Sequence, residues 1–342
     1  MTEADDDTRN RRLEKLRFWR RACADQGAKW KCYNDNGADI PLIFFHGDTD
    51  MGGLYVRRLA AECGYPIAAL APRSIEEPGL RPCVEALGKD MVEDILAFRP
   101  SGPYRLGGYC NGAIIAYECA RRLRERGHEV EVVVMIEPAS LNTRPVFRAV
   151  QQLIAAMLPP PEARSLKAQQ RFGDVMHVVW NIGRLLHLSP RELLGLVRYL
   201  GHRRMMWRGH LVAGEQEALD QERQVRETDA AFKTFHWRSV STYLPLPTQI
   251  PIVALSTGMD GGGRRCGMYD GVQWARVAAN FRHIRLRGHH ATCLSTHVGE
   301  LASDLKSILR GLPPGKTEPP AQRLARQQGD FTILALGKAP GP

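Results

Sequence analysis

The feature that most restricts how this chain can fold is an alternation of short apolar runs with segments of helical periodicity. The run "PLIFFHG" (41–47) has the length and composition of a buried parallel strand. The segment "LYVRRLAAECG" (54–64) follows it with helical spacing and ends at a glycine. The same order recurs in "YPIAALAP" before "VEALGKDMVEDILAF" and in "PYRLGGY" before "NGAIIAYECARRLRERG", and "EVEVVVMIEP" adds another strand. This order predicts an α/β fold with a mostly parallel sheet, right-handed crossovers and flanking helices.

The alternation is interrupted between residues 141 and 245, where helical periodicity continues without a convincing strand. It resumes with strands in "IPIVALSTG" and "FRHIRLRGHH" and a helix in "THVGELASDLKSILRGL". We therefore expect one α/β core that carries a long helical insertion. The predicted parts are a lead-in with a helix at 1–40, the core at 41–140 and 246–312, the insertion at 141–245 and a flexible tail at 313–342.

The charge of the sequence favours an acidic partner. The chain has 47 Lys and Arg against 37 Asp and Glu, which gives a formal net charge of +10. Nucleic acid and an acidic carrier protein are both candidates, and on charge alone a solvated basic surface is the simpler interpretation. The sequence has no aromatic-basic motif of a nucleic-acid binder, so we expect no nucleic-acid partner.

Several other classes are disfavoured by features that the sequence lacks. No apolar run approaches the roughly 18 residues of a membrane helix, and the N-terminus has no apolar signal core. We therefore expect a cytoplasmic protein without a membrane partner. The 8 cysteines form no CxxC pair, so they are interpreted as reduced thiols and no metal site is expected. The segment "LGGYCNGA" lacks the glycine spacing of a dinucleotide site, and we expect no bound cofactor.

The strongest local motif is Gly108-Tyr109-Cys110-Asn111-Gly112, which stands between a predicted strand and a predicted helix. A sharp turn at this place exposes the central side chain above the sheet, and flanking glycines permit the turn. The N–H of Asn111 would lie at a helix N-terminus and point into the same space. The motif predicts Cys110 as a nucleophile and Asn111 as an oxyanion donor, although a buried cysteine in a glycine-rich turn has the same pattern.

A cysteine nucleophile needs a base and an acid that orients it, and in this fold the chain order is nucleophile, acid, base. His289 and His290 follow the last predicted strand, and we favour His290 as the base. Glu137, at the end of "VVVMIEP", is the preferred acid because ligands gather at the carboxyl ends of parallel strands. Asp260 remains the alternative acid. The loop "FFHGDTDMGG" makes the Asp48 N–H the candidate second oxyanion donor, although its glycines also fit a plain turn.

These residues resemble the α/β-hydrolase thioesterases of nonribosomal peptide and polyketide synthesis, over roughly residues 40–310. The most specific segment is "GPYRLGGYCNG", supported by "PLIFFHGDTDMGGLYVRRLAAECGYPIAAL" and "RGHHATCLSTHVGELASDL". The resemblance implies the α/β-hydrolase fold, with the helical insertion as a lid over the substrate channel. It also implies that the acid follows the strand after the nucleophile helix, which is Glu137. The family usually has serine at the position of Cys110 and aspartate at the position of Glu137.

The resemblance implies a substrate acyl, aminoacyl or peptidyl group held as a thioester on the phosphopantetheine of a carrier protein. Because a cysteine gives a thioester intermediate, we expect Cys110 to keep the acyl group activated for release to water, cyclisation or transfer to another acceptor. Alternatives are a shuttle between two carrier proteins, a non-catalytic carrier-binding scaffold and a small-molecule esterase. The acyl group, the acceptor and the oligomeric state are not determined by the sequence.

Overall fold

The computed structural model describes residues 29–47, 54–71, 80–159, 163–186, 190–191, 193–194, 231, 233–259, 267 and 269–312. The predicted tail at 313–342, most of the lead-in and the middle of the helical insertion therefore lie outside the described residues. None of the helices within these ranges combines the length and the apolar character needed to cross a membrane.

The centre of the molecule is a seven-stranded sheet with the strand order β1-β3-β2-β4-β5-β6-β7. All neighbouring pairs are parallel except β1 and β3, which are antiparallel. The strands are β1 (Trp30–Tyr33), β2 (Leu42–Phe45), β3 (Ile67–Leu70), β4 (Tyr104–Tyr109), β5 (Val130–Ile136), β6 (Ile252–Ser256) and β7 (Phe281–Arg285).

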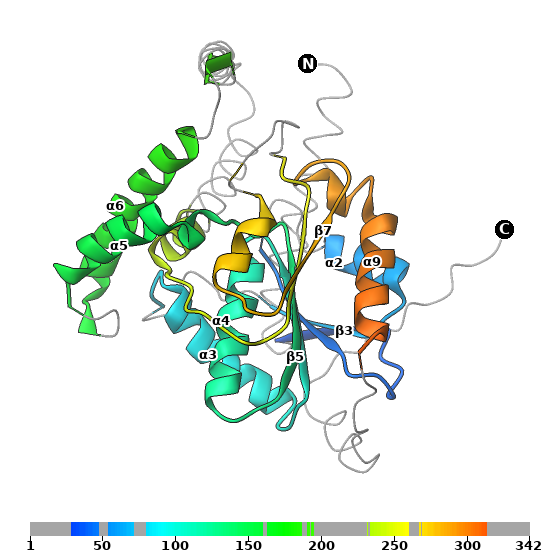
Figure 1. The fold of residues 1–342 in the computed structure, drawn as a ribbon. Coiled ribbons are helices and arrows are strands. Elements are labelled where there is room, and N and C mark those ends of the chain that lie inside the picture. Colours follow the sequence, from blue (N-terminus) through cyan, green and yellow to red (C-terminus); the bar gives the residue numbers. More distant parts are fainter. Residues whose placement is uncertain are drawn as a thin grey trace, which may run out of the picture.

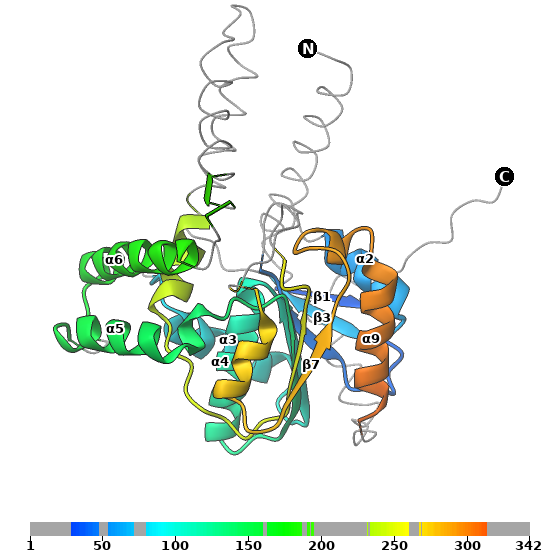
Figure 2. The same ribbon diagram turned by 45° about the horizontal axis from the view of Figure 1, so that its top comes forward.

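Helices cover both faces of this sheet, and this explains why its central strands are mostly apolar. Successive side chains of a strand point to opposite faces. In β2, Leu42 and Phe44 belong to the core on the side of helices α2 (Leu54–Cys63) and α9 (Val298–Arg310), while Ile43 and Phe45 face the other side. Helices α3 (Val84–Phe98) and α4 (Asn111–Glu125) cover that other side (Figures 1 and 2).

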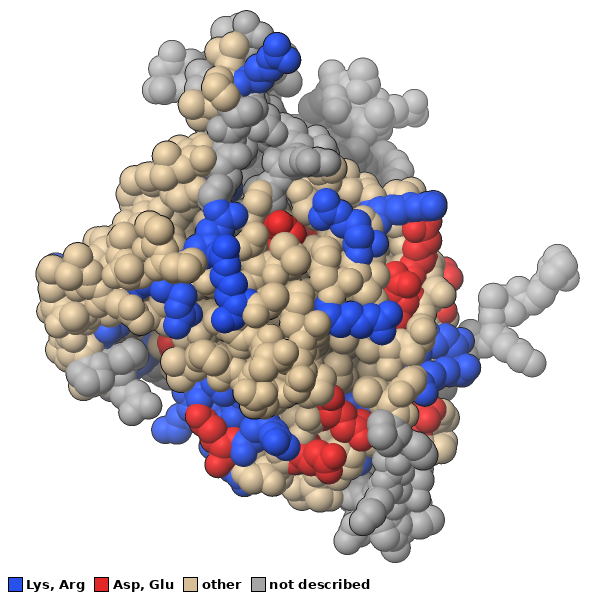
Figure 3. All heavy atoms as spheres, viewed as in Figure 1, with Lys and Arg blue, Asp and Glu red and all other residues tan. Residues whose placement is uncertain are grey.

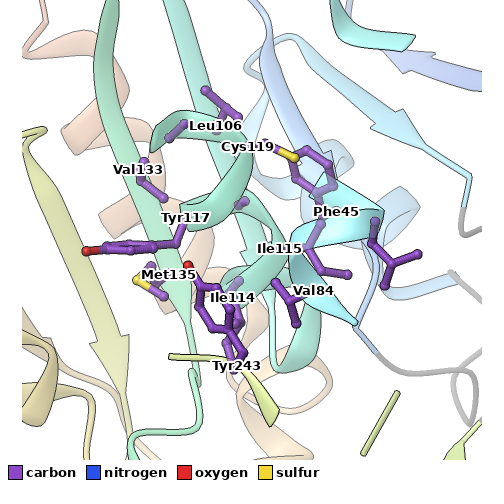
Figure 4. Packing of buried hydrophobic residues seen from close by; sticks show 14 of the residues in the cluster. Phe45, Val84, Leu106, Ile114, Ile115, Tyr117, Cys119, Val133, Met135 and Tyr243 are labelled. Carbon is purple, nitrogen blue, oxygen red and sulfur yellow. The ribbon is translucent and has the colours of Figure 1, made fainter. Parts of the chain in front are cut away.

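The core beneath α4 consists of buried apolar side chains from the sheet and the helix. Figure 4 shows residues of the sheet and of α4 that meet there, among them Leu106, Val133, Ile114 and Tyr117. All four side chains are at most 2% exposed. Burial of each large apolar side chain contributes about 1.5–3 kcal/mol to folding, so this layer fixes the start of α4 against the end of β4.

The described part of the helical insertion forms a lobe beside the core (Figure 1). It contains α5 (Pro145–Ala156) and α6 (Leu166–Leu185). One face of α6 is buried through residues such as Trp180, whose indole N–H donates to Asn142 Oδ1 at 2.9 Å. Asn142 in turn donates to the backbone carbonyls of Val240 and Tyr243, which joins the beginning of the insertion to its end.

The topology is that of the α/β-hydrolase fold, and the predicted mostly parallel sheet with flanking helices is confirmed. The prediction of a lead-in at 1–40 included no strand, whereas the structure places β1 at Trp30–Tyr33, paired with β3 at the sheet edge. β1 has only 4 residues and three of them are half-buried, so neither length nor apolar character distinguishes it in the sequence.

Candidate active site

The site lies where four neighbouring parallel strands end. β4 leads directly into Cys110, β5 into Glu137 and β6 into Thr257, and the loop after β7 carries His290. Since these strands are adjacent and parallel, their carboxyl ends share one edge of the sheet. Residues that are far apart in the sequence are therefore brought to one place.

Cys110 occupies a tight turn between β4 and α4. Its φ of 53° and ψ of −118° are costly for a residue with a side chain, so the surroundings must hold it there. Its N–H donates to the Ile136 carbonyl at 2.9 Å, and its own carbonyl accepts from the Ala113 N–H at 3.2 Å. The sulfur is consequently fixed above the sheet edge at the N-terminus of α4.

The two glycines predicted to flank this turn lie in close backbone contacts. A Cβ on Gly108 would be 2.5 Å from the carbonyl carbon of Gly112, and a Cβ on Gly112 would collide with the Phe45 carbonyl oxygen. Gly47, in the loop after β2, packs on the same turn, because a Cβ on it would lie 2.9 Å from the Asn111 nitrogen. The nucleophile turn and the loop after β2 are therefore packed backbone to backbone.

His290 and Glu137 are in contact through side chains. His290 Nδ1 lies 3.1 Å from Glu137 Oε2, and the glutamate is fully buried. The Thr257 N–H donates to Glu137 Oε1, and the Thr257 hydroxyl donates to Oε2 at 3.3 Å. These contacts fix the carboxylate so that it faces the imidazole.

The environment of His290 favours its protonated form. Burial lowers the pKa of His290, but the charge of Cys110 and hydrogen bonds to Cys110 and Glu137 outweigh this effect. Together with the charge of Glu137, they raise the pKa to about 10. The imidazole ring also stacks with Tyr109, at 5.0 Å between ring centroids, and with Tyr269, at 4.2 Å. The contacts with Glu137 and Cys110 therefore favour the imidazolium form of His290.

The remaining predicted site residues occupy different environments. Asn111 is buried at the first position of α4, where a backbone N–H has no acceptor within the helix. The backbone N–H of His289 donates to the Thr292 hydroxyl at 2.9 Å. Of the two neighbouring histidines, His290 is the one whose side chain is described in contact with the Glu137 carboxylate. Asp48 and Asp260 lie outside the described residues.

Sequence reasoning missed two residues that contact the site, Thr257 and Tyr269. Thr257 could have been predicted from the sequence, because it directly follows β6, and β6 is the neighbour of the strand that leads into Glu137. Tyr269 lies in an irregular segment between β6 and β7 and could not have been predicted in this way. Among the described residues, no group of three His, Cys, Asp or Glu side chains is placed to hold a metal ion.

A comparison with protein families gives a match to one model, described as "Thioesterase domain", over residues 57–145. The matching segment has the sequence pattern of a thioesterase domain. It extends from α2 into the first residue of α5 and includes Cys110 and Glu137, whereas His290 follows it.

Curated relatives are large biosynthetic proteins that match this chain over short lengths. The chain is 28% identical over 150 residues to polyketide synthase PksR of Bacillus subtilis, covering 42% of this chain and 6% of that protein. It is 34% identical over 103 residues to chondramide synthase cmdD of Chondromyces crocatus, covering 30% and 3%. It is 29% identical over 141 residues to indigoidine synthase of Streptomyces lavendulae, covering 39% and 11%. The chain thus spans only 3–11% of the length of these three relatives.

Solved thioesterase structures are also similar to this chain. The NocB thioesterase domain from the nocardicin cluster aligns with a TM-score of 0.49 and 18% identity, over 82% of this chain and 98% of that one. The RedJ thioesterase of Streptomyces coelicolor aligns with a TM-score of 0.46 and 18% identity, over 79% and 85%.

Proposed function

We propose that this protein is a thioesterase-type enzyme that takes an acyl, aminoacyl or peptidyl group from a carrier-protein phosphopantetheine thioester onto Cys110. It then releases the group by hydrolysis or cyclisation, or transfers it to a nucleophilic acceptor. The observation that carries this proposal is the convergence of Cys110, His290 and Glu137 at one sheet edge, with a 3.1 Å contact between the last two. The thioesterase pattern over residues 57–145 supports the same class of chemistry.

In the first half-reaction, His290 carries the proton of the pair and Cys110 acts as the thiolate. The thiolate sulfur attacks the thioester carbonyl carbon. The oxyanion that forms is stabilised by the Asn111 N–H and, in this proposal, by the Asp48 N–H. When the tetrahedral intermediate collapses, the carbon–sulfur bond to pantetheine breaks and His290 donates its proton to the departing sulfur.

In the second half-reaction, neutral His290 removes a proton from the acceptor as the acceptor attacks the acyl carbon. The bond to Cys110 then breaks, the thiolate leaves and the imidazolium is restored, so protons balance over the cycle. Glu137 holds the imidazole through Nδ1 and compensates its charge throughout. Because an acyl-cysteine is itself a thioester, its free energy is close to that of the substrate, which favours transfer to an amine, a hydroxyl or a second thiol.

The lobe formed by α5 and α6 supports a carrier protein as the partner. Val146, Leu153, Val178 and Ile182 on these helices are 52–78% exposed. Figure 3 shows this lobe as largely uncharged, with Lys and Arg atoms where it meets the core. The acidic residue of the two helices, Asp174, is already paired with Arg238 at 2.6 Å. We propose that an acidic carrier protein docks on this lobe through apolar contacts and the positive charge of nearby Lys and Arg side chains.

A shuttle that moves the group between two carrier proteins is the second candidate function. The cysteine at position 110 favours it, since transfer between thioesters is nearly neutral in free energy. A non-catalytic carrier-binding scaffold is the alternative outside the enzymes. It predicts that Cys110 reacts with a thiol probe no faster than an ordinary buried cysteine.

Intact-protein mass spectrometry after mixing with an acylated carrier protein tests the proposal. We expect a mass gain that is confined to Cys110 and absent in Cys110→Ala. Passage of the mass to an unloaded second carrier would establish the shuttle, whereas decay to free acid or cyclic product would establish release. If no adduct forms with a panel of acyl groups and Cys110 is also unreactive toward a thiol probe, the enzyme proposal is wrong.

A further inference from the structure

The imidazole of His290 stacks against two tyrosine rings that come from different parts of the chain. Tyr109 ends β4, and its ring lies 5.0 Å from the imidazole centroid at an interplanar angle of 25°. Tyr269 precedes the short helix η3 (Gly271–Arg276), and its ring lies at 4.2 Å and 27°. Both angles are small, so both tyrosines present ring faces, rather than edges, to the imidazole.

The orientation of these rings is built into the fold. The Tyr109 hydroxyl donates to the backbone carbonyl of His290 at 2.7 Å, which ties the ring to the same residue whose side chain it covers. Tyr109 is 1% exposed and Tyr269 is 8% exposed, so neither ring turns freely into solvent. Burial thus restricts both rings, and the hydrogen bond restricts Tyr109 as well.

Aromatic faces carry negative electrostatic potential and attract a cation that lies within about 6 Å of the ring centroid. Both tyrosines meet that distance. The attraction acts only when His290 is an imidazolium, because the neutral ring carries no net charge. A pair of apolar aliphatic side chains in the same places would bury the imidazole equally well without this attraction.

We propose that Tyr109 and Tyr269 are positioning residues whose ring faces hold His290 in its imidazolium form, the form that a cysteine nucleophile needs. The inference rests on the proposed function only in treating Cys110 and His290 as the reacting pair. A serine enzyme needs a neutral histidine that can accept a proton, so these ring faces would be a disadvantage there.

Among the residues that the structure describes, the other titratable groups that face His290 include Cys110, Glu137 and Cys293. Cys110 and Glu137 favour the imidazolium by charge and hydrogen bonding. Cys293 donates from its sulfur to the His290 carbonyl at 3.2 Å, and burial raises its pKa, so it stays a neutral thiol. Substitution of Tyr269 by a residue without an aromatic ring leaves all three of these groups in place.

The test compares Tyr269→Leu with Tyr269→Phe, because leucine keeps the apolar cover but removes the ring face, whereas phenylalanine keeps both. The pKa of His290 is measured by NMR on protein with labelled histidine, with its signal identified by its absence in His290→Asn. We expect Tyr269→Leu to lower the pKa by about half to one unit and Tyr269→Phe to leave it unchanged. Alkylation of Cys110 by iodoacetamide, followed against pH, should show its high-pH inflection move by the same amount.

Neither readout uses a carrier or a thioester, so failure to turn over any carrier substrate leaves this test intact. Tyr109→Leu provides a second measurement if Tyr269→Leu does not fold. Tyr109→Phe keeps the ring face but also removes the hydrogen bond to the His290 carbonyl, so it should give the smaller shift. An unchanged His290 pKa in the leucine variants would overturn the proposal. Equal shifts in the leucine and phenylalanine variants would also overturn it, since the hydroxyl and not the ring face would then be responsible.

Discussion

Thr257 holds both carboxylate oxygens of Glu137, one through its backbone N–H and the other through its hydroxyl at 3.3 Å. Glutamate is one methylene longer than the aspartate that the resembling thioesterases usually have at this position. The backbone that carries Glu137 must therefore lie farther from the histidine than an aspartate would require. Glu137 has a φ of 52°, which turns its backbone away from the extended path of β5. This backbone turn and the two hydrogen bonds from Thr257 together place the carboxylate next to Nδ1 of His290.

Replacing the Thr257 hydroxyl tests its hydrogen bond to Glu137. We expect Thr257→Val to lower kcat about tenfold, because one hydrogen bond to a charged group is lost while the N–H contact remains. The Met259 N–H, which donates to the same hydroxyl at 3.1 Å, also loses its acceptor. Thr257→Ser keeps the hydroxyl and should retain most of the activity. Equal losses in both variants, measured as carrier deacylation rates, would contradict a role for the hydroxyl.

A second prediction separates the two candidate acids. Glu137→Gln keeps the shape but removes the charge that compensates the His290 imidazolium, so we expect kcat to fall by about 100-fold or more. Its His290 pKa should also fall below the value of about 10, because both the charge and the hydrogen bond of Glu137 raise it. Asp260→Asn serves as the matched variant and should retain near-normal activity. The reverse ranking of the two variants would move the acid role to Asp260.

Packing at the nucleophile turn predicts a strong effect of one methyl group. Gly112→Ala places a Cβ against the Phe45 carbonyl oxygen and 2.8 Å from the His46 carbonyl carbon, and neither backbone atom can move freely. We expect the free energy of unfolding to fall by about 1–3 kcal/mol. Gly299→Ala in α9 is the control, since its Cβ would meet nothing within 4 Å, and it should be neutral or stabilising by up to about 1 kcal/mol. Urea unfolding of both variants checks the difference.

The buried histidine of the insertion predicts loss of stability in acid. Burial lowers the pKa of His236 from 6.5 to about 4, so between these values the unfolded chain binds a proton that the folded chain does not. Stability therefore falls as the pH drops from about 6.5 toward 4, by up to about 3 kcal/mol from this group. Urea midpoints at pH 7, 5.5 and 4.5 measure the slope. His236→Gln should show a shallower slope, and an unchanged slope would contradict the assignment.

The proposed docking lobe gives a prediction about charge. Val178 is 57% exposed on α6, so a polar substitution there costs little stability. Val178→Asp should slow acylation by an acidic carrier severalfold, whereas Val178→Lys, its charge-reversed control, should not. Both variants should react normally with iodoacetamide at Cys110, because the site itself is unchanged. The difference between them should shrink as ionic strength rises, and equal effects at all salt concentrations would argue against docking on this lobe.

Much of the fold is predictable because the periodicities are local. Most strands of the sheet are short, mainly apolar runs between turn residues, and α4 follows Cys110 in an unbroken helical pattern. β1 was not predicted, because an edge strand of 4 residues leaves too few apolar positions to recognise. The site was predictable in part, since residues that end parallel strands must share an edge, which placed Glu137 and the His289–His290 pair near Cys110.

The sequence by itself determined the α/β architecture and the residue types available at the sheet edge, because both follow from short-range patterns. Only the tertiary structure decided that His290, and not its neighbour, contacts Glu137, since adjacent residues in a loop differ only in the direction of their side chains. It also brought Thr257, Tyr109 and Tyr269 to the carboxylate and the imidazole. The contacts of Thr257 with Glu137 and of Tyr109 with His290 join residues more than 100 positions apart. The geometry of all these contacts depends on how the strands and loops pack rather than on any local pattern.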